Sequence, residues 1–148
     1  MLILNRRLHF DYNVHETVDA GISLTGAEVK SIRKNSVSIN GCYVSIKGHE
    51  AFLLNWNIPK YEQAYKDNDY DPCRPRRLLL KKAEVIRMST TIKRDGYTIV
   101  VSKCYTNKRG YIKLELALVS GKKRYDKREY IKKKDERREG KRKFNVNK

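Results

Sequence analysis

The chain has no long run of apolar residues. No stretch of its 148 residues approaches the roughly 20 apolar residues that a membrane-spanning helix requires, which excludes that class of protein. The opening Met-Leu-Ile-Leu is too short for a signal peptide, and arginines follow it instead of preceding it. We therefore expect a soluble, cytoplasmic protein.

Cysteine is scarce as well. There are three, an odd number, and Cys42, Cys73 and Cys104 are widely spaced with no CxxC motif. This spacing argues against a disulfide framework and against tetrahedral zinc, so we expect buried or inert thiols and no metal or cofactor.

The motifs of common enzyme sites are missing. The chain has no glycine-rich phosphate loop, and its three histidines belong to no recognisable motif with Ser or Cys. Asp67, Asp69 and Asp71 alternate like a calcium loop but lack the glycine and the distal glutamate of an EF-hand. The sequence therefore favours a binding protein over an enzyme.

Positive charge is what the chain has in excess. Lys and Arg number 34 against 17 Asp and Glu, which gives a net charge of +17 and a pI of about 9.9. From Ser120 to Lys148 there are 14 Lys or Arg and five Asp or Glu, so +9 of the charge lies in this last segment. A basic body with a more basic tail is typical of a protein that binds a polyanion.

Alternating apolar and polar residues predict a mainly β domain. Strand patterns cover residues 10–24, 42–47, 51–56, 97–106 and 111–118. In the last of these, the even-numbered positions are Ile or Leu and face inward, whereas Lys113 and Glu115 face outward. Gly21 indicates a bulge or a sharply coiled strand. Short turns make the neighbours antiparallel, and a small closed barrel best removes their exposed edges.

Two short helices and one long loop interrupt these strands. Thr25 and Glu28 fit a capping box at the start of a helix that ends near Asn35. A second helix has apolar residues at i, i+3 and i+7 and ends at Gly96. Between them, residues 57–77 show no period, which is typical of a functional or mobile loop.

The tail is polar on nearly all sides. The pairs Glu129–Lys133 and Glu139–Lys143 favour a helix, but each contributes only about 0.2–0.5 kcal/mol. Such a segment buries too little apolar area to offset the entropy of ordering. We expect a barrel at residues 1–120 and a tail at 121–148 that is disordered alone and folds on a partner.

A series of short motifs runs through the chain in a specific order. They are Asn5-Arg6-Arg7, Asp11-Tyr12, Ala20-Gly21-Ile22, Gly26-Ala27-Glu28-Val29-Lys30-Ser31-Ile32-Arg33, Asp71-Pro72, Arg77-Leu78-Leu79-Leu80, Gly121-Lys122-Lys123 and Asp126-Lys127-Arg128. In this order they resemble the SsrA-binding protein (small protein B) family, which partners transfer-messenger RNA in bacterial trans-translation. The resemblance departs from the usual family pattern at His9-Phe10 and at Tyr125, where Arg-His and His are commoner.

The resemblance implies both a fold and a role. The fold is an antiparallel barrel of the oligonucleotide-binding kind with flanking helices. The body binds the tRNA-like domain of the RNA, and the tail becomes helical in the empty mRNA channel beside the decoding centre of a stalled ribosome. Elongation factor Tu is implied as a further partner, through the charged RNA.

Candidate RNA contacts in the body come partly from charge and partly from the resemblance. The basic residues at the N-terminus and on the first helix can contact the RNA backbone, and the resemblance adds an acidic residue, a leucine, a strand lysine and a dilysine. The set is Arg6, Arg7, Asp19, Lys30, Arg33, Leu79, Lys113, Lys122 and Lys123. Thr25 and Glu28 are assigned to the helix cap.

Candidate ribosome contacts lie in the tail. By resemblance, Asp126, Lys127 and Arg128 engage the ribosome, and Tyr125 precedes them where it could stack on a base. The pattern after them extends the set to Ile131, Lys132, Lys133 and Lys134.

Two other functions compete with this adaptor role. The chain could be a structural protein that binds ribosomal RNA permanently, or, more remotely, a nuclease built on the same barrel. The RNA that copurifies with the protein, and any metal-dependent cleavage, would distinguish the three.

Overall fold

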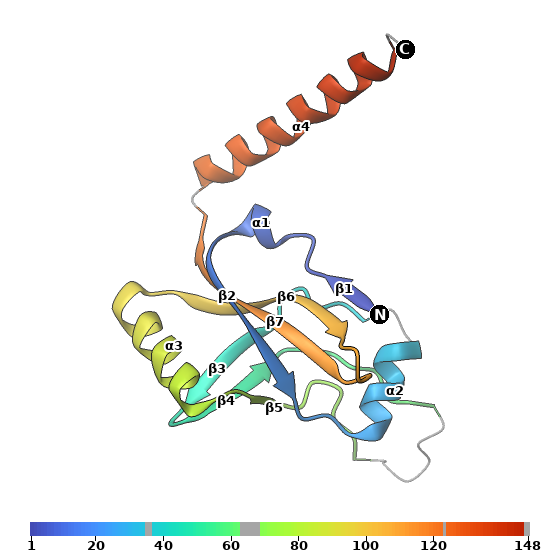
Figure 1. The fold of residues 1–148 in the computed structure, drawn as a ribbon, viewed down its shortest axis with the longest axis vertical. Coiled ribbons are helices and arrows are strands. Elements are labelled where there is room, and N and C mark those ends of the chain that lie inside the picture. The colour runs from blue at the N-terminus through green and yellow to red at the C-terminus, as the bar shows by residue number, and fades with distance from the viewer. Residues whose placement is uncertain (35–36, 63–68, 123, 147–148) are drawn as a thin grey trace.

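The structure is a computed structural model, and it describes residues 1–34, 37–62, 69–122 and 124–146, with the side chains of 124–126 and 139–146 left out. Its elements are β1 (Leu2–Leu4), α1 (Leu8–Asp11), β2 (Tyr12–Ile22), α2 (Gly26–Lys34), β3 (Tyr43–Lys47), β4 (Glu50–Leu54), β5 (Arg76–Leu79), α3 (Lys82–Asp95), β6 (Thr98–Thr106), β7 (Ile112–Gly121) and α4 (Arg124–Val146). Figure 1 shows a compact body of strands and short helices from which α4 projects.

Six strands close into a ring. The order is β6-β3-β4-β5-β2-β7, and β7 pairs again with β6, while β1 adds to the edge of β6. Every pairing is antiparallel. The predicted small antiparallel barrel with short flanking helices is therefore confirmed (Figure 1).

Alternation along the strands fills the barrel. Ile112, Leu114, Leu116 and Leu118 of β7 are buried inside it with residues such as Leu53, Trp56 and Ile99. Lys113 and Glu115 face outward as predicted. A second, smaller cluster lies on the outside, where Leu8 of α1 packs with Val100, Ala117 and Val119. Burial of Leu8 explains why a helix as short as α1 forms here.

The structure corrects the expected role of Gly21. The bulge on β2 lies between Val14 and Glu16, whereas Gly21 pairs regularly with Leu79 and Lys113. A Cβ atom at this position would lie 3.2 Å from the Cβ atom of Leu79, closer than most real Cβ contacts, so a larger residue would require Leu79 to shift.

Three short elements differ from the sequence prediction. Phe10 lies in α1 instead of starting a strand, and β1 and β5 are additional strands. The strand β5 begins at Arg76, within the segment expected to be a loop. Both new strands have three or four residues, too few to show a period.

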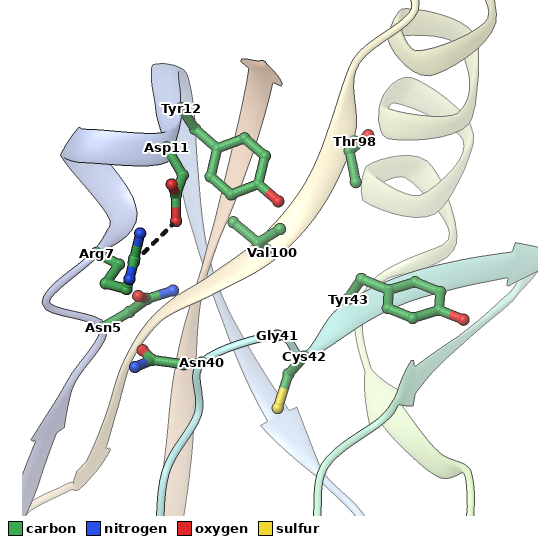
Figure 2. Close-up of a pocket in the computed structure, with 10 residues that line it drawn as sticks. All are labelled: Asn5, Arg7, Asp11, Tyr12, Asn40, Gly41, Cys42, Tyr43, Thr98 and Val100. Carbon is green, nitrogen blue, oxygen red and sulfur yellow. Dashed lines mark ion pairs between the residues drawn. The ribbon is translucent and has the colours of Figure 1, made fainter. Parts of the chain in front are cut away.

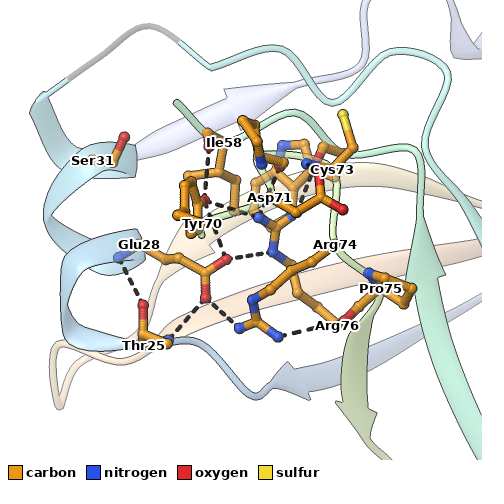
Figure 3. A network of polar contacts seen from close by, with 12 residues as sticks. Thr25, Glu28, Ser31, Ile58, Tyr70, Asp71, Cys73, Arg74, Pro75 and Arg76 are labelled. Atoms are coloured by element: carbon orange, nitrogen blue, oxygen red, sulfur yellow. Dashed lines mark hydrogen bonds and ion pairs between the residues drawn. The ribbon is translucent and has the colours of Figure 1, made fainter. Parts of the chain in front are cut away.

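A buried ion pair joins α2 to the start of β5. Glu28 of α2 and Arg76 are both fully buried, and the Nε atom of Arg76 donates to Oε2 of Glu28 at 2.6 Å (Figure 3). The guanidinium also donates to the carbonyl oxygens of Trp56 at 2.6 Å and Pro72 at 2.9 Å. Arg74 makes a second ion pair with Glu28. One arginine thus connects the helix, the loop and the strand.

Glu28 also completes the helix cap. The backbone N–H of Thr25 donates to Oε1 of Glu28 at 3.0 Å, and the N–H of Glu28 donates to Oγ1 of Thr25 at 3.2 Å. Both hydrogen bonds of the predicted capping box are present. Burial raises the pKa of Glu28, but hydrogen bonds from Arg74, Thr25 and Arg76 outweigh it and hold the pKa below its ordinary value.

The tail has helical backbone. Residues Arg124 to Val146 form α4, which is the conformation that the resemblance implies for the tail on the ribosome, and the expected disorder of the tail alone stays a prediction. The favourable Glu–Lys spacing supports this helix, and contacts between its first turns and α1 add stabilisation that the sequence pattern does not reveal.

Replacing Glu28 tests the buried network. Glu28→Gln leaves the buried Arg76 charge without its partner, so we expect a loss of about 3–5 kcal/mol in the free energy of unfolding near neutral pH. The lowered pKa means that the unfolded chain binds the proton more readily. The stabilisation by Glu28 is therefore complete above its ordinary pKa of 4.5 and is lost as the pH falls through the folded value.

Urea unfolding of the two proteins at several pH values measures this effect. The stability difference between the parent and Glu28→Gln should shrink below the ordinary pKa of Glu28. Glu62→Gln is the matched control, since Glu62 pairs with Lys34 at 3.5 Å but is 83% exposed, and its removal should cost at most about 1 kcal/mol. A difference that stays constant with pH would contradict the role assigned to Glu28.

Thiol reactivity tests the packing of the core. Cys42 and Cys104 are buried, and burial raises the pKa of each thiol to about 12, whereas Cys73 is exposed. A thiol reagent at mildly alkaline pH should label one cysteine in the folded protein and all three in denaturant. Labelling of two or three thiols in the folded protein would show that the barrel is packed differently.

Candidate nucleic-acid interface

Two of the predicted RNA contacts meet at one end of the barrel. Gly21 on β2 pairs with Leu79 on one side and with Lys113 on the other. The Nζ atom of Lys113 lies 3.5 Å from the position that a Cβ atom on Gly21 would occupy, so the lysine passes directly over the glycine. Leu79 is 57% exposed, because the alternation of β5 places Leu78 in the core. An exposed leucine and a cation thus lie side by side.

A hollow of about 340 Å³ adjoins this pair. Leu24 and Val29 line it from the β2–α2 segment, and Gly110 and Tyr111 line it from the turn between β6 and β7. Tyr111 is 65% exposed, the most exposed large apolar side chain of the described residues. An open aromatic ring beside a leucine and a lysine can stack a base while the lysine holds a phosphate.

Tyr111 is a residue that the sequence reasoning missed. The sequence indicates only that its side chain faces outward, because Tyr111 alternates with the apolar positions as Lys113 and Glu115 do. Its neighbours come from three other parts of the chain, which the sequence does not bring together.

Asp19 lies on the same strand face but has different neighbours. It is exposed and pairs across the sheet with Glu115. Burial raises the pKa of Tyr105, and a hydrogen bond with the nearby Asp19 carboxylate raises it further. Glu115 in turn contacts Lys103 at 3.3 Å. Asp19 is therefore placed to accept hydrogen bonds or to orient its neighbours, not to bind phosphate.

The predicted cations of α2 point to two places. The Nη2 atom of Arg33 donates to the carbonyl oxygen of Gly110 at 2.7 Å, which holds the turn that carries Tyr111. Lys30 lies over the ring of Tyr61, with its Nζ atom 5.8 Å from the ring centre. Arg33 thus holds the turn next to Tyr111, whereas Lys30 is exposed.

Arg6 and Arg7 lie in the segment between β1 and α1. Both are exposed, and Arg7 pairs with Asp11 at 3.4 Å. Arg7 and Asp11 also line a pocket of about 540 Å³ that Tyr12 and Tyr43 border (Figure 2). Arg7 is therefore separate from the Leu79–Lys113 pair, whereas Arg6 borders another hollow together with Arg33 of α2.

The tail residues fall into two groups. Lys122 and Lys127 contact α1 within the chain. The other described residues of this set are exposed along α4; they are Arg128, Ile131, Lys132, Lys133 and Lys134. Lys123 lies outside the described residues. Tyr125 and Asp126 belong to α4, and the positions of their side chains lie outside the described part.

Metal and membrane features are absent from the described part of the chain. Its residues contain no group of three or more His, Cys, Asp or Glu side chains that could hold a metal ion. None of its helices has the length and apolar character needed to cross a membrane.

Comparisons with known proteins point to one family. The SmpB protein family model matches residues 2–146. The SsrA-binding protein of Thermosipho africanus is 46% identical over 135 residues, which cover 91% of this chain and 90% of the relative. That of Malacoplasma penetrans is 44% identical over 146 residues, which cover 99% of each.

A solved structure is also similar. It is described as "tmRNA-SmpB: a journey to the center of the bacterial ribosome", and it matches with a TM-score of 0.68 and 39% sequence identity over 88% of this chain and 94% of the other. The match of the family model to nearly all of the sequence, together with these relatives, shows that this chain belongs to the SmpB protein family.

Proposed function

We propose that the protein is an adaptor that binds the tRNA-like domain of transfer-messenger RNA and delivers it to stalled ribosomes for trans-translation. Membership of the SmpB family supports this role, because its relatives are SsrA-binding proteins. In this chain, the observation that supports the role most is that Leu79 and Lys113, two expected RNA contacts, lie side by side next to Gly21.

The body holds the RNA in this proposal. Leu79 and Tyr111 offer apolar surface on which an unstacked base can lie, and Lys113 neutralises a neighbouring phosphate. Arg33 keeps the Tyr111 turn in place through Gly110. Asp19 accepts hydrogen bonds from a base edge or a 2′-hydroxyl, or orients the side chains next to it.

The tail reaches the ribosome. The exposed cations Arg128, Lys132, Lys133 and Lys134 project along α4, away from the Leu79–Lys113 end of the barrel (Figure 1). Placed in the mRNA channel near the decoding centre, they would neutralise ribosomal phosphates only when no message occupies the channel. Elongation factor Tu joins through the charged RNA, and the protein acts in the cytoplasm as an adaptor without catalytic chemistry of its own.

The RNA that copurifies with the protein tests the proposal. Enrichment of one RNA with a tRNA-like end is the expected result. Recovery of ribosomal RNA alone would replace the adaptor role with that of a structural ribosomal protein. Metal-dependent cleavage of RNA that EDTA abolishes would instead indicate a nuclease.

Lys113→Ala tests the RNA contact of the body. Losing a charged contact to phosphate should weaken binding to the isolated tRNA-like domain by about tenfold or more, and should reduce the log–log salt slope by about one. Lys47→Ala is the matched control, since Lys47 is an exposed strand lysine of the β3–β4 hairpin. Equal effects of the two substitutions would indicate a diffuse charge effect and no defined site.

Removing the tail tests whether the barrel binds the RNA and the tail engages the ribosome. Deletion from Asp126 onward should leave affinity for the isolated RNA within about threefold, because the proposed contacts lie in the barrel. Peptide tagging in a reconstituted translation system should be abolished. A collapse of RNA affinity in the shortened chain would place the main RNA contact in the tail.

A further inference from the structure

The base of the tail helix is held against α1. Directly after β7, the backbone N–H of Lys122 donates to the carbonyl oxygen of Asp11 at 3.0 Å. The ammonium of Lys122 donates to the carbonyl oxygen of His9 at 2.5 Å. The chain is therefore fixed to α1 before α4 begins, and Figure 1 shows α4 leaving the barrel beside α1.

Two aromatic rings and two lysines form the contact between the helices. The ring centres of Phe10 and Tyr130 lie 6.3 Å apart, with their planes inclined by 59°. Lys122 lies over the Tyr130 ring at 4.4 Å, and Lys127 lies over the Phe10 ring at 5.6 Å. Lys127 also pairs with Asp11 at 3.7 Å. Each cation thus contacts both a ring and an oxygen atom of α1 or α4, which gives the contact a defined geometry.

This contact holds only the beginning of α4. Phe10, Lys122, Lys127 and Tyr130 are all partly buried, whereas every described side chain from Ile131 to Arg138 is exposed. Ile131, the neighbour of Tyr130, is 45% exposed and faces away. The rest of α4 therefore projects from one small contact at its base.

A projecting helix amplifies any change at its base. Residues 131–146 of α4 span about 22 Å at 1.5 Å per residue. A tilt of roughly 20° at the base would move the far end by about 8 Å, close to the diameter of a helix. A tail that must enter a narrow channel therefore depends on the geometry of its first turns.

We propose that Phe10, Lys122, Lys127 and Tyr130 form an orienting joint, which sets the direction in which the tail helix leaves the barrel. Phe10 and Tyr130 are positioning residues in this joint, since they act through α4 and not on the RNA. The consequence for tagging rests on the proposed function, but the orientation of the helix does not.

Distances between spin labels test the orientation directly. Cys73 is the one exposed native cysteine, and Arg137→Cys adds a second label on the exposed part of α4. Tyr130→Ala and Phe10→Ala should broaden or shift the distance distribution between the labels in the full chain. Tyr130→Phe keeps the ring that Lys122 covers, and Glu136→Gln changes an exposed residue farther along α4, so both should preserve the parent distribution.

Tagging and RNA binding measured on the same variants separate the joint from the RNA site. Tyr130→Ala should reduce peptide tagging by about three- to tenfold, and affinity for the isolated RNA should stay within about twofold. An unchanged label distribution in Tyr130→Ala would overturn the joint, and so would an RNA affinity that falls as far as tagging does. Failure of the parent chain to tag would overturn the proposed function while leaving the label measurement decisive for the joint.

Discussion

The buried pair of Glu28 and Arg76 is the interaction on which the remaining structure depends. Arg76 has no exposed surface, and its guanidinium satisfies backbone carbonyls at both ends of the segment between β4 and β5. A buried charge is tolerated only with a partner, so burial of Arg76 at the start of β5 requires Glu28 of α2 beside it. The barrel strand β5, which carries Leu79, starts at the same arginine.

The functional surfaces follow from this arrangement. With α2 fixed by Glu28, Arg33 reaches the turn between β6 and β7 and holds Gly110. With β5 fixed by Arg76, Leu79 lies against Gly21. The positions of Leu79 and of the turn that carries Tyr111 therefore depend on the polar network around Glu28 and Arg76.

The sequence predicts those features that depend on local pattern. Alternation identifies Lys113 as outward-facing, and the Thr25–Glu28 spacing identifies the start of α2. The partner of Glu28 could not be predicted, because Arg76 lies 48 positions away in a segment without period. Tyr111 could not be identified from the sequence, because only the fold brings it to the same hollow as Leu79 and Val29. The contact between Phe10 and Tyr130 at the base of the tail could not be predicted either, because the two residues lie far apart in the sequence.

One strand connects the two functional ends of the molecule. Lys113 lies at the start of β7 and Gly121 at its end, directly before the contact between Lys122 and α1. Eight residue steps of an extended strand span about 26 Å. Because β7 pairs with both β2 and β6, these two ladders fix its extended length and its register. The barrel therefore fixes the distance between the proposed RNA contact at Lys113 and the base of the tail helix.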